Sequence, residues 1–177
     1  MMTNPEGISA PPDQDRLADV IRQFAELHDR GYPARPGWAY QSSFHLLLAL
    51  GRRFTVAPSR RALADMPDRL CYGNCASYAA EHHEADVMVY AEGFALINVG
   101  GADFHLPHAW VVHPDGTVVD PTWSDPPGLA YVGVPIADPG LWPHDGGGLF
   151  ADFEKTLPLL RDGFAADAIA DIGQPLT

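Results

Sequence analysis

The stretch that decides the fold is His108-Ala-Trp-Val-Val-His-Pro-Asp-Gly-Thr-Val-Val-Asp-Pro-Thr-Trp123. Two apolar runs flank Pro114-Asp115-Gly116, a strong turn signal, so the stretch predicts a β-hairpin. With Gly116 left-handed after a three-residue loop, His113 to Asp115, residues whose numbers sum to 228 face each other. His108 then lies opposite Asp120. Directly opposed side chains are about 5 Å apart on one face, whereas a one-residue slip would place them on opposite faces.

The segments around this hairpin predict helices first and strands afterwards. Residues from Val87 to Ile97 are β-type, and Leu106–His113 and Thr117–Asp120 form the hairpin strands. Apolar residues at helical spacing and capping residues predict four helices, which cover Asp13 to Gly31, Ser42 or Ser43 to Gly51, Pro58–Met66 and Cys71–His83. The expected fold is therefore α+β, with N-terminal helices packed on a small antiparallel sheet.

The length of 177 residues predicts one domain, over residues 13–177, after a flexible N-terminus at residues 1–12. Residues 126–148 contain five Pro and six Gly, so we expect a long loop there that forms a rim or lid over a cleft. The tail from Ala151 predicts short helices interrupted by Pro158 and Gly163.

The charge is divided unevenly along the chain, whose net charge is -12. Residues 1–69 carry nine basic and eight acidic side chains, whereas residues 70–177 carry two basic and fifteen acidic ones. An acidic half repels phosphate, so we expect no nucleic-acid partner. No secretory signal or long apolar run is visible, so we expect a cytoplasmic protein without a membrane partner or a structural disulfide. The sequence gives no indication of the oligomeric state.

Three residues suggest nucleophilic catalysis. Cys71 opens a predicted helix, whose N-terminal N–H groups favour a thiolate and can bind an oxyanion. A thiol also needs a base to take its proton, and His108 is the candidate base. The base needs a third group to hold its tautomer, and Asp120 is the candidate for this role.

These residues resemble the transglutaminase-like branch of the papain-like cysteine superfamily. The resemblance covers residues 70–123 and rests on an aromatic after Cys71, Glu92-Gly93-Phe94, His108-Ala109-Trp110 and Asp120-Pro121-Thr122-Trp123. It implies a Cys-His-Asp triad, a papain-like/transglutaminase-like fold and a thioester intermediate. The implied activity is amide or peptide hydrolysis, deamidation, or acyl transfer to an amine.

The choice of nucleophile stays open between two cysteines. Gly73-Asn74-Cys75 resembles the Gly-x-Cys opening of transglutaminase-like proteins. Cys71 is favoured because Tyr72 follows it and because 22 residues separate it from Gly93, near the spacing of that family. Cys75 would then be a small core residue one turn inside the helix.

Other residues have expected places around this site. Tyr72, Asn74 and Gln41 are candidates for the second oxyanion donor or for lining the site, and Trp110 and Trp123 are expected as aromatic residues beside it. Glu92 is expected either to face the substrate or, in slight preference, to lie at a solvated strand end. Cys71 and Cys75 lack a second pair of ligands at zinc-finger spacing, so no metal or cofactor is expected.

Two other classes of function remain open. One is a catalytically silent binding module that recognises a peptide or a protein partner. The other is a deamidating or proteolytic effector or toxin. For an enzyme, Asp103, Asp125, Asp138 and Asp145 near the site predict a neutral or basic peptide or protein amide as substrate.

Overall fold

A computed structural model describes residues 12–57, 66, 70–123 and 128–176. The elements in chain order are α1 (Pro12–Gly31), α2 (Ser43–Leu50), β1 (Arg52–Arg53), α3 (Cys71–Asp86), β2 (Val89–Val99), β3 (Ala102–Val112), β4 (Val118–Val119), β5 (Ala130–Ile136), the 3-10 helix η1 (Pro139–Leu141), α4 (Phe153–Asp162) and β6 (Gln174–Pro175). The predicted α+β class is confirmed. The predicted helix over Pro58–Met66 and the predicted flexible N-terminus lie almost entirely outside the described residues.

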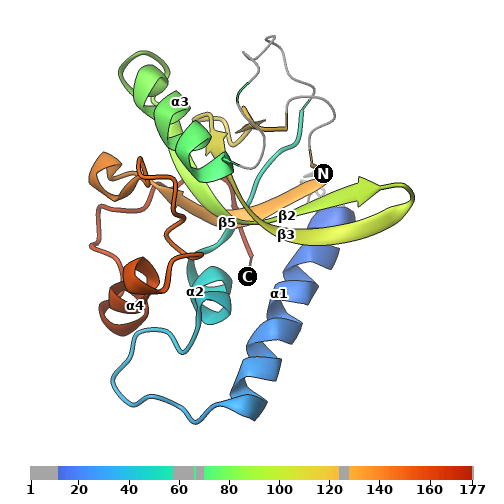
Figure 1. The fold of residues 1–177 in the computed structure, drawn as a ribbon, viewed down its shortest axis with the longest axis vertical. Helices are drawn as coiled ribbons and strands as arrows, with labels where there is room; N and C mark the ends of the chain where they lie inside the picture. Colours follow the sequence, from blue (N-terminus) through green and yellow to red (C-terminus); the bar gives the residue numbers. More distant parts are fainter. Residues whose placement is uncertain (1–11, 58–65, 67–69, 124–127, 177) are drawn as a thin grey trace, which may run out of the picture.

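The strands form one curled antiparallel sheet in the order β4-β3-β2-β5-β1-β6. The long hairpin of β2 and β3 pairs residue by residue from Val89 with Val112 to Val99 with Ala102. On its other side β2 pairs with β5. Figure 1 shows the tip of this hairpin extending toward the start of α1, where Arg16 donates a hydrogen bond to Asp103.

The helices pack on one face of this sheet. α1 and α2 contact β5, and α3 contacts β3 and β2; Figure 1 shows α3 well apart from α1 and α2. The helix starts and ends follow from local sequence, since Ser42 caps α2 and Gly51 follows its last residue. No helix in the described ranges is long and apolar enough to cross a bilayer.

The opposite face of the sheet has its own apolar cluster, centred on Trp110. The Trp110 ring contacts Phe54 and Tyr131 edge-on, with ring centroids 5.7 and 5.0 Å apart. Side chains alternate across a strand, so Trp110 lies on this face while Ala109 and Val111 join the helix-side core. His108 shares the parity of Trp110.

The prediction of an irregular loop over residues 126–148 was wrong for residues 130–136, and residues 126 and 127 lie outside the described part of the chain. Ala130–Ile136 is the buried strand β5, paired with β2 in the middle of the sheet. The apolar run from Tyr131 to Ile136 carries this strand despite the high Gly and Pro content around it. Pro135 is tolerated because its carbonyl accepts from Ala170 N, so its nitrogen also points away from β2.

The hairpin register also differs from the prediction. Val112 pairs with Val118 and Val111 with Val119, a shift of two residues. The loop consists of Pro114–Gly116 and is closed by a hydrogen bond of 3.0 Å from His113 N to Thr117 O, with Gly116 at φ 82° as expected. Because side chains alternate with period two, a shift of two keeps every residue on its predicted face.

The C-terminal prediction was wrong at Pro158. α4 continues through this residue and ends before Gly163, whose φ is 80°. Pro158 is the sixth residue of the helix, so its missing N–H removes one intrahelical hydrogen bond near the N-terminal end. The helix keeps its other bonds and its Asp152 cap.

Two glycines let β2 and β5 approach closely behind Trp110. Gly93 pairs with Gly133, and a Cβ on Gly133 would lie 2.4 Å from Glu92 O and 2.6 Å from Trp110 Cη2. We expect Gly133→Ala to lower the free energy of unfolding by about 3 kcal/mol, because backbone and ring must both move. Urea denaturation followed by circular dichroism measures this loss. The control is Gly31→Ala, where a Cβ meets nothing within 4 Å; equal costs for the two variants would contradict the packing argument.

Candidate active site

Cys71 is the first residue of α3, and its side chain is partly buried. The first hydrogen bond of the helix runs from Asn74 N to Leu70 O, at 2.9 Å. The N–H groups of Cys71, Tyr72 and Gly73 therefore precede the helical ladder and lie at the positive end of the helix dipole. This end of α3 can accommodate a negative charge on sulfur or on a substrate oxygen.

His108 and Asp120 form a buried pair. His108 Nε2 lies 2.7 Å from Asp120 Oδ2, and the two residues are 1% and 4% exposed. The face of the imidazole stacks on Trp123, with centroids 3.6 Å apart and an interplanar angle of 6°. The ring is thus held by a carboxylate at one edge and an indole over one face.

Asp120 directly follows the last residue of β4, and its carboxylate accepts four hydrogen bonds. Oδ2 accepts from His108 and, at 2.8 Å, from the Tyr131 hydroxyl. Oδ1 accepts from the backbone N–H groups of Thr122 at 3.0 Å and Trp123 at 2.9 Å. These donors fix the carboxylate, because a buried anion is stable only when it is paired and hydrogen-bonded.

The Cys71 side chain also interacts with the His108 imidazole. Burial alone would lower the pKa of His108, but hydrogen bonds to the Asp120 and Cys71 side chains and the charges of both groups raise it above its ordinary value. Since Nε2 faces Asp120, Nδ1 is the nitrogen left for the thiol. The contacts therefore run from the Cys71 side chain to the His108 imidazole and from the imidazole to the Asp120 carboxylate.

Cys75 lies in the core, one turn further into α3. It is fully buried, and its thiol donates to Ala109 O at 3.2 Å. Burial, together with the nearby charge of Asp120, raises the pKa of the Cys75 thiol well above its ordinary value. A thiol in this setting stays neutral, which favours Cys71 as the reactive sulfur.

Thr122 connects α3 to the turn that carries Asp120. Asn74 Nδ2 donates to Thr122 Oγ1 at 3.1 Å, and the Thr122 side chain also hydrogen-bonds the Cys75 thiol. Asn74 therefore contacts the turn that carries Asp120. The sequence did not indicate this contact, because it joins residues that are 48 positions apart.

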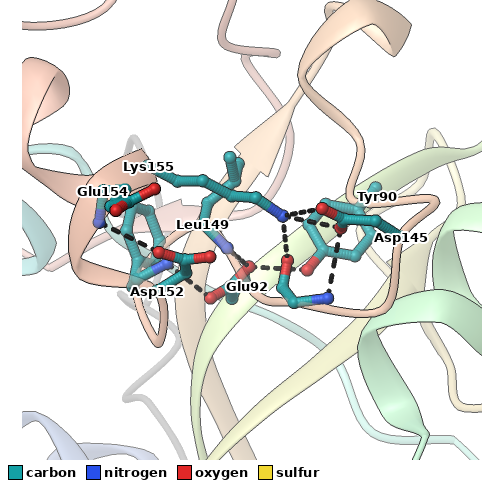
Figure 2. Close-up of polar contacts among 9 residues, drawn as sticks. Tyr90, Glu92, Asp145, Leu149, Asp152, Glu154 and Lys155 are labelled. Atoms are coloured by element: carbon teal, nitrogen blue, oxygen red, sulfur yellow. Dashed lines mark hydrogen bonds and ion pairs between the residues drawn. The ribbon is translucent and has the colours of Figure 1, made fainter.

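The expectation of a solvated Glu92 was wrong. Glu92 is 1% exposed and lies on the helix side of the sheet, where Figure 2 shows it beside Tyr90 and Leu149. It accepts from Tyr90 Oη at 2.6 Å, Leu149 N at 2.7 Å and Phe150 N at 2.7 Å. Burial raises the pKa of Glu92 above its ordinary value, although these hydrogen bonds act in the opposite direction.

Glu92 thereby holds a loop against the first turn of α3. A Cβ on Gly148 would lie 2.6 Å from both Glu92 Oε1 and Tyr72 Cε1, and one on Gly73 would lie 3.6 Å from Gly146 Cα. We name residues 145–151 the latch loop. Because it contacts the two residues that follow Cys71, its position affects the nucleophile end of α3.

A second anchor of the latch loop lies at the surface. Lys155 Nζ contacts both oxygens of Asp145, at 2.6 and 2.7 Å, and donates to Gly147 O at 2.8 Å (Figure 2). Thr156 Oγ1 donates to Leu149 O at 2.6 Å. The loop is therefore fixed from α4 as well as from the sheet.

The other predicted residues, Gln41, Trp110 and Tyr72, have contacts of their own. Gln41 uses its amide on the backbone of Arg35, accepting from N at 2.6 Å and donating to O at 3.2 Å. Trp110 is a fully buried core residue beside the triad, as expected, with its ring centroid 6.4 Å from that of His108. Tyr72 lines the first turn of α3 and contacts the latch loop, and burial, followed by the charge of Glu92, raises the pKa of its phenol.

Tyr131 is a site residue that sequence reasoning missed. Tyr131 lies in β5, the strand that the Gly and Pro content of residues 126–148 did not indicate. Its hydroxyl donates to Asp120 and accepts from Gly128 N at 2.8 Å. Burial, and then the charge of Asp120, raises the pKa of this phenol, so it remains a donor. The signal that could have revealed it is the apolar run that begins at Tyr131.

Comparison with known proteins found no relative of this chain. No family model, no curated protein and no solved structure matches the chain. The function must therefore be argued from the site itself.

Proposed function

We propose that this protein is a cysteine-dependent acyl-transfer enzyme of the transglutaminase-like type within the papain-like superfamily. The observation that carries the proposal is a chain of contacts that begins at the Cys71 thiol, at the start of α3, and continues through His108 to Asp120. Buried imidazole–carboxylate pairs next to a thiol at a helix N-terminus have the parts that acyl transfer requires.

The proposed reaction has two halves. His108 takes the Cys71 proton, and the sulfur attacks an amide carbonyl carbon to form a tetrahedral oxyanion. The N–H groups at the first turn of α3 stabilise the oxyanion. When the C–N bond breaks, His108 gives its proton to the leaving amine, and a thioester to Cys71 remains. Water or an amine then attacks the thioester and releases an acid or a new amide.

The substrate class that we propose is a neutral or basic peptide or protein amide. The net charge of -12 supports this, since it disfavours anionic partners at long range. The local support is smaller than the sequence implied, because Asp103 and Asp145 are paired with Arg16 and Lys155. Competition for labelling between acidic and basic peptides at low salt tests this proposal, and a preference for acidic peptides would reverse it.

The central test is labelling with iodoacetamide at pH 6.5, where an ordinary cysteine is only about 1% thiolate. We expect the wild-type chain to gain one adduct, with Cys71→Ala losing it and Cys75→Ala keeping it. His108→Gln should slow labelling at least tenfold, because the base is gone. Intact mass spectrometry and peptide mapping measure both results.

Other outcomes would identify other functions. An adduct that persists in Cys71→Ala and disappears in Cys75→Ala would move the nucleophile to Cys75. Equal, slow labelling in the wild type and in His108→Gln would indicate a silent binding module. Formation of an amide with an added primary amine, in preference to release of the free acid, would favour transfer to amines over hydrolysis.

A further inference from the structure

Three side chains with metal-binding atoms meet where the end of α1 packs against the start of α2. They are His28 and Asp29, in the last turn of α1, and His45, in the first turn of α2. One ligand atom from each lies within 4.8 Å of the others. The Asp29 carboxylate is close to both rings, with Oδ1 at 3.2 Å from His45 Nε2 and 3.7 Å from His28 Nδ1.

One imidazole nitrogen of His28 lacks a hydrogen-bond partner among the described residues. Its Nδ1 is buried and has no hydrogen-bond partner within the described part of the chain. The ring is stacked on Tyr32 at 4.9 Å and meets His45 edge-on at 5.7 Å. A buried nitrogen left unpaired is unfavourable, and an ion or an ordered water is a common reason for one. Asp29 Oδ1 at 3.7 Å is too distant for a hydrogen bond.

His45 is oriented from its other ring nitrogen. Its Nδ1 lies 2.8 Å from Ser42 Oγ, the N-cap of α2. With Nδ1 occupied, Nε2 is directed at Asp29. Histidines that bind metals usually have the second ring nitrogen held in this way, which fixes the tautomer and the ring plane.

We propose that His28, Asp29 and His45 bind a divalent transition metal ion, with Zn²⁺ as the best match. Zn–N and Zn–O bonds of about 2.0–2.2 Å in tetrahedral geometry place ligand atoms about 3.4 Å apart. The separations of 3.2 and 3.7 Å lie on either side of this value. The ligand nitrogens of the two imidazoles lie within 4.8 Å of each other.

The ligand set also fits the environment. Two imidazoles and a carboxylate are ligands that Zn²⁺ takes in proteins, and the exposed side of Asp29 leaves a fourth position for water. An ion at this site is bound by residues of both α1 and α2 and so links the two helices. This site lies on helices other than α3, so it is separate from the chemistry of Cys71 (Figure 1).

The test is a titration of the metal-stripped full chain with Zn²⁺ by calorimetry. It is made in a Cys71→Ser background, so that the Cys71–His108 pair does not compete for the ion. We expect one ion per chain and a higher melting temperature with Zn²⁺, because the ion binds only the folded state. His28→Gln and His45→Gln should each weaken binding at least tenfold.

A matched control is His113→Gln. His113 faces one carboxylate, that of Asp115 at 3.1 Å, and belongs to no three-ligand group among the described residues. This variant should bind Zn²⁺ as the parent does. Co²⁺ provides a second readout, since tetrahedral Co²⁺ with these ligands absorbs visible light, and this absorption should be lost in Asp29→Asn. Zn²⁺ binding that is equal in the parent, His28→Gln and His45→Gln would overturn the proposal, as would the absence of any binding at one ion per chain.

Discussion

Replacing Asp120 with asparagine is expected to leave a folded protein whose Cys71 is labelled at least tenfold more slowly at pH 6.5. The Asp120 carboxylate accepts hydrogen bonds from both His108 and Tyr131 at Oδ2. An asparagine that keeps its oxygen on the backbone donors of Oδ1 places an NH₂ group at this position, and an NH₂ group donates and cannot accept from His108 or Tyr131. The imidazole then loses the partner that selects its tautomer and stabilises its positive charge. Iodoacetamide labelling, compared with that of the wild type, measures the effect.

The same variant should reverse the direction in which the fold shifts the His108 pKa. Burial alone lowers this pKa, and Asp120 is a main reason that it is raised in the wild type. NMR titration of the imidazole should therefore give a pKa above about 6.5 in the wild type and below it in Asp120→Asn. A pKa that stays raised in the variant would contradict the assigned role of Asp120.

The pH dependence of stability follows from the same shift. A histidine with a raised pKa in the folded state stabilises the protein fully below its unfolded pKa of about 6.5. This contribution is lost as the pH rises through the folded pKa of His108. The difference in unfolding free energy between the wild type and Asp120→Asn should therefore be larger at pH 6 than at pH 8, and urea denaturation at both pH values measures it.

Tyr131→Phe is the matched control for this series. It removes one donor to Asp120 but keeps the carboxylate charge and the His108 contact. It also removes the acceptor of Gly128 N, so we expect labelling close to that of the wild type and a loss of stability of about 2 kcal/mol, the usual size for two hydrogen bonds. A labelling defect in Tyr131→Phe equal to that in Asp120→Asn would mean that rigidity of the turn, rather than charge, controls Cys71.

The pairing of His108 with Asp120 could be predicted although the detailed register was wrong. Pro114-Asp115-Gly116 indicates the turn, and alternation along the strands decides which side chains share a face. A two-residue error in register leaves that face unchanged. Asp120 then needs only to lie at the end of β4, where its turn directs the carboxylate back to His108.

The parts of the site that depend on contacts distant in sequence could not be predicted in this way. Tyr131 belongs to a strand whose Gly and Pro content indicated a loop, and Thr122 meets Asn74 across 48 residues. Glu92 finds backbone donors 57 and 58 residues away. No local pattern distinguishes a carboxylate that will be buried by a later loop from one at a solvated strand end.

The largest loss of stability is expected for Glu92→Ala. This change leaves Tyr90 Oη, Leu149 N and Phe150 N without an acceptor in the core and opens a cavity beside them. We expect the free energy of unfolding to fall by about 4 kcal/mol, since a buried donor left unpaired costs about 1–3 kcal/mol and such costs are not fully additive. Denaturation in urea gives the loss directly.

Glu92→Gln separates the charge of this residue from its shape. In the wild type the raised pKa means that the folded state binds a proton more tightly than the unfolded state. The contribution of Glu92 to stability therefore decreases as the pH rises from its unfolded pKa of about 4.3 through its folded pKa. The neutral amide removes this decrease, so the slope of unfolding free energy against pH above 4.3 should be less negative in Glu92→Gln.

The latch loop should report the same change locally. Because Glu92 holds residues 145–151 against Tyr72 and Gly73, both Glu92 variants should increase hydrogen exchange at Leu149 and Phe150 and in the first turn of α3. Lys155→Met is the control, since it removes only the contact with exposed Asp145 and the bond to Gly147 O, and should cost about 1 kcal/mol or less. If Lys155→Met frees the loop as much as Glu92→Gln does, the surface contact is the anchor and the buried carboxylate is not. If Glu92→Gln instead exchanges as the wild type does while Cys71 labelling is unchanged, the loop is held by packing and Glu92 has no influence on the nucleophile.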